Sequence, residues 1–128
     1  MPKIYNAPDV PAPSAHFQHI AEVASGGRLF YFAGQTGRTP DGTIAEDIEG
    51  QTEQAYRNLI GLCEAAGLTI DNVVQTTIYM TDRNEIHGMH DAQKKILGDA
   101  KPPSALIFVS GLAMPAMKIE IVAVAAKD

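Results

Sequence analysis

The spacing of apolar residues along the chain predicts two helices. From residue 47 to residue 66, apolar side chains recur at helical spacing, which is typical of a helix buried on one face. Gly67 follows at the position where a glycine commonly ends such a helix. A second helix is expected to begin at a cap formed by Asp82 or Asn84 and to run to about Leu97.

Shorter apolar runs, separated by glycines and prolines, predict strands. These runs are His19–Val23, Arg28–Ala33, Val73–Met80, Ser104–Ser110 and Met117–Ala126. The first two are joined by Ser-Gly-Gly at residues 25–27, which indicates a hairpin, and the proline-containing residues before them are expected to be an extended lead-in. The order ββαβαββ predicts an α+β fold with two helices on one face of a mixed sheet.

The last predicted strand is apolar on both faces. One face carries Met117, Ile119, Ile121, Ala123 and Ala125, and the other carries Lys118, Glu120, Val122, Val124 and Ala126. Two helices can cover only one face of the sheet, and little of the chain remains to cover the other. We therefore expect a second copy of the chain to cover it in a homo-oligomer.

Length and charge limit the classes of protein to which this chain is expected to belong. The chain has 128 residues, enough for one domain over residues 1–128, and a formal net charge of −5 with no window rich in Lys and Arg. Nucleic acid is therefore not an expected partner. The longest apolar stretch is too short for a membrane helix, no signal peptide is visible, and the single cysteine, Cys63, fits a reducing compartment. These features predict a soluble cytoplasmic protein.

Glu120 is the most informative candidate for chemistry. Its carboxylate shares a strand face with Val122 and Val124, so it would be partly desolvated there. Such a carboxylate suits general acid or base work, or the positioning of a water molecule. The alternative is a structural ion pair with Lys118 or with a partner subunit, and the pattern alone favours that alternative.

Other polar residues give weaker signals. His87 and His90 lie three positions apart on the second helix, but no third ligand stands at a recognisable spacing, so we predict no metal site. His90 falls beside the apolar stripe of that helix, where a packed histidine is the simpler interpretation. Cys63 is expected to be an inert core residue, and the glycine at position 34 would let a ligand approach the backbone.

Several short motifs, in this order and spacing, resemble those of the RidA (YjgF-like, reactive intermediate deaminase A) family. They are Ala33-Gly34-Gln35, Asp47-Ile48-x-x-Gln51-Thr52, Asn58-Leu59, Ala65-Ala66-Gly67-Leu68, the run from Asp71 to Tyr79, and Lys118-Ile119-Glu120-Ile121-x-Ala123-Val124-Ala125. The resemblance covers the chain from about residue 28 to its end. It implies a chorismate-mutase-like fold, a homotrimer and ligand clefts between neighbouring subunits. It also implies hydrolysis of reactive enamines or imines to 2-oxo acids and ammonia without a cofactor.

The sequence departs from the family's pattern at the residues that would bind substrate. Ser104 stands where deaminating members carry an Arg that holds the substrate carboxylate, and Leu106 replaces a cysteine. Phe17 replaces a tyrosine, Ala33 a serine and His90 an asparagine. Glu120 and Gly34 are kept; a ligand carboxylate would use backbone N–H groups near Gly34 or Ala105, or a cation of the neighbouring subunit.

The resemblance therefore predicts a site with altered specificity. Its candidate catalytic residues are Glu120 and His90, and its candidate substrate-binding residues are Phe17, Ala33, Gly34, Ser104, Ala105 and Leu106. The expected ligand is a small amine-bearing metabolite, with no cofactor and no metal. A trimer that binds small molecules without catalysis is the alternative, and an endoribonuclease is disfavoured by the charge of −5.

Overall fold

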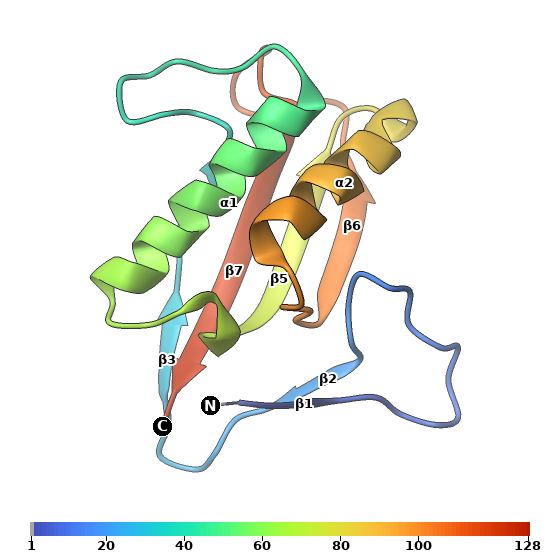
Figure 1. Ribbon diagram of the computed structural model, residues 1–128, viewed down its shortest axis with the longest axis vertical. Helices are drawn as coiled ribbons and strands as arrows, with labels where there is room; N and C mark the ends of the chain where they lie inside the picture. The colour runs from blue at the N-terminus through green and yellow to red at the C-terminus, as the bar shows by residue number, and fades with distance from the viewer. Residues whose placement is uncertain (1) are drawn as a thin grey trace.

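One long strand organises the main sheet of this protein. In the computed structural model, which describes residues 2–128, strand β7 pairs with three other strands (Figure 1). The strands of this sheet are β3 (Arg28–Tyr31), β4 (Gln35–Thr36), β5 (Val73–Met80), β6 (Ser104–Phe108) and β7 (Ile119–Lys127). Their order is β3-β7-β5-β6, with β4 pairing further along β7. Only β5 and β6 run parallel, so the sheet is mixed, as predicted.

Helix α1 (Ile48–Ala65) begins and ends as the sequence predicts. The side chain of Asp47 caps its start by accepting a hydrogen bond from the Gly50 N–H at 3.1 Å. At its end Gly67 has a φ of +76°, a left-handed conformation that favours glycine. This turn lets the Leu68 N–H donate to the Cys63 carbonyl at 2.8 Å.

Helix α2 (Ile86–Leu97) is preceded by a 3₁₀ turn over Arg83–Glu85, and a second 3₁₀ turn, Ile70–Asn72, precedes β5. Asp82, one of the two predicted caps, accepts a hydrogen bond from the Asn84 N–H. Both helices lie on the same face of the main sheet (Figure 1). In the part of the chain that the structure describes, neither helix is long and apolar enough to cross a membrane.

The predicted N-terminal hairpin is wrong. Strand β2 (Ile20–Glu22) pairs with β1 (Lys3–Tyr5) in a separate two-stranded sheet, whereas β3 pairs with β7. The Tyr5 hydroxyl donates to Glu22 Oε1 at 3.1 Å across this small sheet. The glycines at 26 and 27 do form a turn, in which the Gly27 N–H donates to the Ala24 carbonyl. The backbone of β3, however, forms its hydrogen bonds with the long strand β7 and not with β2. Strand β4 is a two-residue element, too short to show a period in the sequence.

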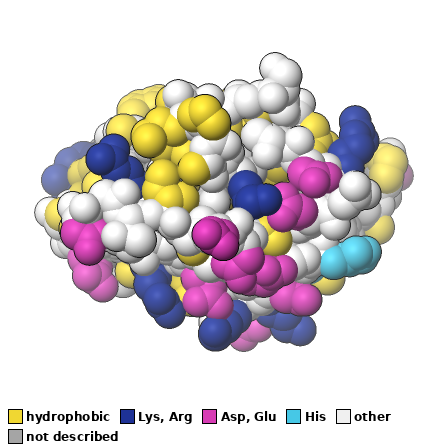
Figure 2. Space-filling model, turned by 90° about the horizontal axis from the view of Figure 1, so that it is seen from above, with side chains coloured by type: hydrophobic (Ala, Val, Ile, Leu, Met, Phe, Trp, Pro, Cys, Tyr) yellow, Lys and Arg dark blue, Asp and Glu magenta, His cyan; other side chains and the backbone are white. Residues whose placement is uncertain are grey.

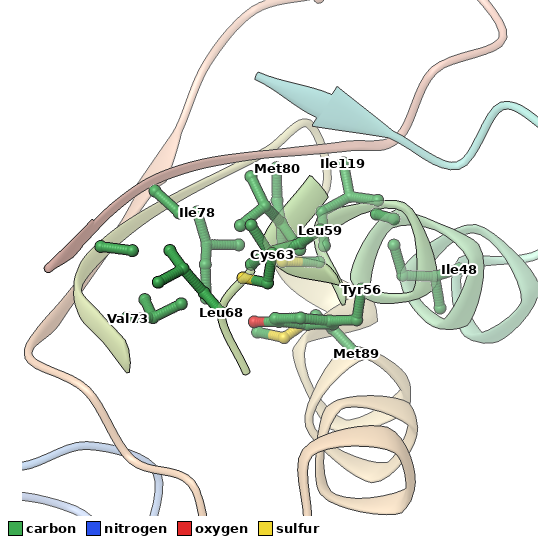
Figure 3. Close-up of a cluster of buried hydrophobic side chains, with 14 residues drawn as sticks. Ile48, Tyr56, Leu59, Cys63, Leu68, Val73, Ile78, Met80, Met89 and Ile119 are labelled. Carbon is green, nitrogen blue, oxygen red and sulfur yellow. The ribbon is translucent and has the colours of Figure 1, made fainter. Parts of the chain in front are cut away.

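The hydrophobic core lies between the helices and the main sheet (Figure 3). Of the two predicted faces of β7, the one with Ile119, Ile121, Ala123 and Ala125 packs against the helices, and all four side chains are buried. The helices contribute Ile48, Tyr56, Leu59, Cys63 and Met89 to the same cluster. On the opposite face of the sheet, Val122 and Val124 are half-buried, while Tyr31 is 76% exposed and Ile107 42% exposed. No helix of residues 2–128 covers this open face.

Gln51 joins α1 to the segment that leads into β7. Its side chain is fully buried, and its Nε2 donates to the carbonyls of Ala45 at 2.8 Å and Ala116 at 2.9 Å. Its Oε1 accepts from the Lys118 N–H at 2.8 Å. The amide thus satisfies three backbone groups that would otherwise have no partner at the helix–sheet junction.

We expect Gln51→Leu to lower the free energy of unfolding by about 3 kcal/mol, because it leaves buried backbone groups unpaired. Gln54→Leu is the matched control in the same helix: Gln54 makes one hydrogen bond, to Asn58, so its loss should cost less than about 1 kcal/mol. Urea unfolding of both variants measures the difference. Equal losses would show that the Gln51 bonds do not hold the junction.

Candidate functional site

A small cavity lies between α2, β6 and residues 14–17. Its volume is about 200 Å³. Four of the predicted site residues line it together: Phe17, His90, Ser104 and Leu106. Ile78 and Met89 add apolar wall beside Phe17 and Leu106, and Ser14, His16 and Gln93 complete the lining with polar side chains.

The pairing of β6 with β5 explains why Ser104 and Leu106 face this cavity. Ser104 lies opposite Thr76 and Leu106 opposite Ile78, and both of these β5 residues are buried beneath the helices. The Thr76 hydroxyl donates to Ser104 Oγ at 2.8 Å. Ala105 lies between them and therefore belongs to the opposite, open face of the sheet. Ala105 therefore does not line the cavity with the other predicted site residues.

Two histidine rings form one wall of the cavity. The rings of His16 and His90 stack with their centroids 3.7 Å apart and an angle of 13° between their planes. Burial, helped by the neighbouring rings of His16 and His87, lowers the pKa of His90, and Asp91 opposes the shift. His90 is therefore favoured as a neutral imidazole rather than as a cation.

Glu120 lies on the open face of the sheet. It alternates with buried Ile119 and Ile121 along β7, and it is flanked by Thr36 on β4 and Tyr79 on β5. Within residues 2–128 its carboxylate makes no ion pair or hydrogen bond. Lys118, one of the two partners considered for a structural ion pair, instead contacts Glu85, with 3.2 Å between Nζ and Oε2.

Gly34 packs directly against this carboxylate. A Cβ on residue 34 would collide with Glu120 Oε2 and would lie 3.0 Å from Glu120 Cδ. Any larger residue at this position would therefore push the carboxylate aside. Ala33 and Gly34 are both exposed, so the end of β3 and the Glu120 carboxylate form one accessible surface.

The candidate residues therefore form two groups on opposite faces of the sheet. The helix-side group lines the cavity and contains His90, whereas the open-face group contains Glu120 with Gly34. A single chain does not bring the two candidate catalytic residues together. Cys63 is buried in the core, and burial raises the pKa of its thiol, which agrees with the predicted inert role.

Five residues that line the cavity are absent from the predicted site: Ser14, His16, Ile78, Met89 and Gln93. His16 lies in the proline-containing lead-in, and nothing local in the sequence indicates that its ring stacks on His90. Gln93 is a buried amide on α2, and a polar residue among the apolar positions of that helix was the available signal. The described residues contain no group of three or more His, Cys, Asp or Glu that could hold a metal ion.

The end of the molecule at which both helices begin is acidic (Figure 2). Asp47 and Glu49 lie at the start of α1, and Asp82 and Glu85 lie before α2. Carboxylates are favourable beside helix N-termini, so these residues have a structural explanation. Lys and Arg side chains are scattered among these carboxylates in Figure 2 and form no continuous basic patch on this face.

Comparison with known proteins gives consistent matches over most of the chain. A family model described as endoribonuclease L-PSP matches residues 8–127. A RutC family protein of Pyrococcus horikoshii is 32% identical over 110 residues, which cover 84% of this chain and 86% of that protein. A 2-iminobutanoate/2-iminopropanoate deaminase of Mus musculus is 26% identical over 125 residues, covering 96% and 90% of the two chains. A crystal structure of a Rid-family protein of unknown function from Yersinia pestis superposes with a TM-score of 0.86 at 28% identity, covering 98% of each chain.

The lowered pKa of His90 predicts a pH dependence of folding. The folded state favours the neutral ring. The contribution of His90 to the free energy of unfolding is therefore complete above pH 6.5, the pKa of a histidine in the unfolded chain, and it declines as the pH falls below that value. We expect the free energy of unfolding of the wild type to fall more than that of His90→Asn between about pH 7.5 and pH 5, near the reference histidine pKa. Urea titrations at both pH values test this, and equal losses in the two proteins would contradict it.

Proposed function

The chain belongs to the RidA (YjgF-like) family, and we propose that it hydrolyses a small imine or enamine in clefts between the subunits of a homotrimer. The observation that carries this proposal is the Glu120 carboxylate, which lies unpaired among residues 2–128 and packs against Gly34 on an uncovered sheet face. The similarity to a relative named as a 2-iminobutanoate/2-iminopropanoate deaminase supports the reaction class.

A trimer would bring together the helix-side group and the open-face group, which lie apart within one chain. The helix-side cavity opens on one face of the sheet and Glu120 lies on the other, so a complete site needs Glu120 from a neighbouring subunit. The exposed apolar side chains of the open face, including Tyr31 and Ile107, would be buried by the same contact. One assembly would thus cover the apolar face and complete the cleft.

The proposed reaction adds water across the carbon–nitrogen double bond. Glu120 takes a proton from water as the oxygen bonds to the imine carbon, and a proton passes to the nitrogen. Cleavage of the carbon–nitrogen bond then releases ammonia and leaves a carbonyl group. An enamine enters the same sequence after it tautomerises to the imine. The neutral His90 ring can accept and return a proton on the opposite side of the cleft.

The remaining predicted residues would shape the cleft. Phe17 and Leu106 supply apolar walls, and Ser104 supplies a hydroxyl group. Gly34, with Ala33 beside it, leaves room for a ligand to approach the backbone next to the carboxylate. Ala105, which faces the open side, would contact the neighbouring subunit rather than line the helix-side cavity.

One observation favours a second candidate, a trimer that binds a small molecule without catalysis. The position of the family's carboxylate-binding Arg holds Ser104, which already accepts a hydrogen bond from Thr76. An endoribonuclease, the activity named by the family model, fits poorly with a net charge of −5. For the compartment we propose the cytoplasm, because the single thiol, Cys63, is buried and unpaired with another cysteine.

We expect light scattering to give about 41 kDa, three times the chain mass of 13.7 kDa. Val122→Lys should dissociate the trimer, because it places a charge at the centre of the open face. Arg57→Glu, at an exposed position on α1, is the control and should leave the mass unchanged. A wild type that stays monomeric at micromolar concentration would overturn the proposed assembly and the shared cleft.

Glu120→Gln should lower turnover by roughly 10²- to 10⁴-fold, the range for losing a general acid or base, with little change in melting temperature. The substitution keeps the size of the side chain but removes its charge. Glu85→Gln is the matched control, since Glu85 pairs with Lys118 away from the proposed cleft and should retain turnover. Loss of the trimer or a large drop in melting temperature for Glu120→Gln, with ligand binding intact, would assign Glu120 a structural role.

A further inference from the structure

A second cavity lies beside β4, at the edge of the sheet that carries Gly34. Its volume is about 270 Å³, and Gly34, Thr36 and Arg38 are among the residues that line it. Resting on the proposed function, we propose that Arg38 is a substrate-binding residue, which holds an acidic group of the ligand while the reacting carbon lies at Glu120. The ligand is then an anion, and one subunit supplies both the cation and the carboxylate of the site.

The alternation of side chains brings Arg38 to the same face as Glu120. A Cβ on residue 34 would collide with Glu120 Oε2, and Thr36 lies opposite Glu120 in the pairing of β4 with β7. Gly37 faces the other way, because a Cβ there would collide with the backbone of α1. Residues 34, 36 and 38 therefore follow one another along the open face, with Arg38 two positions beyond the residue that lies opposite Glu120.

The backbone of Arg38 is held in place from two sides. Asn58 on α1 donates from its Nδ2 to the Arg38 carbonyl at 2.8 Å and to the Thr36 carbonyl at 3.1 Å. Arg38 also pairs with Ile44 in an antiparallel bridge, which closes the loop between β4 and α1 (Figure 1). The side chain thus starts from a fixed point beside the cavity, so less entropy is lost when it binds a ligand.

The guanidinium group points no donor at a carboxylate of its own chain. A Cβ on Gly42 would lie 3.5 Å from Arg38 Nη2, so the guanidinium rests against a residue without a side chain. Asp41, in the same loop, accepts hydrogen bonds from the Thr39 hydroxyl and the Thr43 N–H, and these bonds lower its pKa to about 2. Among residues 2–128 the exposed Arg38 side chain makes no ion pair. Its five N–H donors can therefore meet a carboxylate as a planar fork.

The positions of the two charged groups set the size of the ligand. Neighbouring strands lie about 4.8 Å apart and two residues along a strand about 7 Å apart, which places the Cα atoms of Arg38 and Glu120 roughly 8 Å from each other. No ion pair joins the two side chains within residues 2–128, so they do not neutralise each other. The arginine side chain itself spans several ångströms, and one short-chain acid can therefore touch both groups, with its carbon–nitrogen double bond beside Glu120.

Two compounds of the same shape test the inference without catalysis. We expect wild-type protein to bind 2-oxobutanoate at least about tenfold more tightly than the uncharged 2-oxobutanamide in a nuclear magnetic resonance titration, the size expected for one charge-assisted contact. Arg38→Gln should weaken binding of the acid about tenfold and leave binding of the amide unchanged. Arg57→Gln removes the same charge from an exposed position on α1 and is the matched control, which should leave both affinities unchanged.

A kinetic comparison distinguishes the role of Arg38 from that of Glu120. An amino-acid oxidase converts 2-aminobutanoate to the 2-imino acid in the assay, its amount sets the imine concentration, and ammonia release is measured. We expect Arg38→Gln to raise KM about tenfold with little change in kcat, because a contact made equally in the ground state and the transition state acts on KM. Arg38→Lys, which keeps the charge but not the fork, should recover part of the loss.

The outcomes are distinct. Equal affinities of the wild type for the acid and the amide, binding of neither, or a preference for the acid that survives Arg38→Gln would overturn the role of Arg38; continued hydrolysis of the imine would leave the deaminase proposal in place. A preference that depends on Arg38, without acceleration of imine hydrolysis by the wild type, would overturn the deaminase proposal and support Arg38 as an anion-binding residue. A lowered melting temperature of Arg38→Gln with equal loss of both affinities would assign Arg38 a structural role instead.

Discussion

The register of β7 is the constraint on which the rest of the structure depends. Strands β3, β4 and β5 all pair with β7, so its alternation decides which side chains meet the helices and which face the open side. A slip by one residue would expose Ile119 and Ile121 and would bury the Glu120 carboxylate in the core. Burial of an unpaired carboxylate is costly, so folding energy itself holds Glu120 on the open face.

Most elements could be predicted because their signals are local. The helix that ends before Gly67 shows a period, a cap and a terminating glycine within its own segment, and the strand Val73–Met80 is rich in β-branched residues. The pairing of β2 could not be predicted in this way. Its partner, β1, is a three-residue strand in a proline-rich lead-in, and no local pattern distinguishes that pairing from a hairpin with β3.

The placement of some candidate residues in the fold could be predicted for the same physical reason. Alternation along a strand places Ser104 and Leu106 on one face and Ala105 on the other, so the sequence already contained the division that the structure displays. The stacking of His16 on His90 is different, because it joins residues from distant segments and depends on the path of the lead-in. Family resemblance suggested which positions to consider as a site, and the structure divides those positions between the two faces of the sheet.

The cavity wall formed by residues 14–17 belongs to a segment outside the main sheet. Strands β1 and β2 form a sheet of their own, which residues 14–17 precede along the chain on the β2 side. The contacts of this region with the rest of the molecule include the hydrogen bond from the Gln18 N–H to the Lys101 carbonyl and the stacking of His16 on His90. Substitutions in the segment can therefore alter the cavity without disturbing the core cluster around Tyr56 and Leu59. The part of the cavity wall that residues 14–17 contribute can thus diverge during evolution while the core that holds the fold together is preserved.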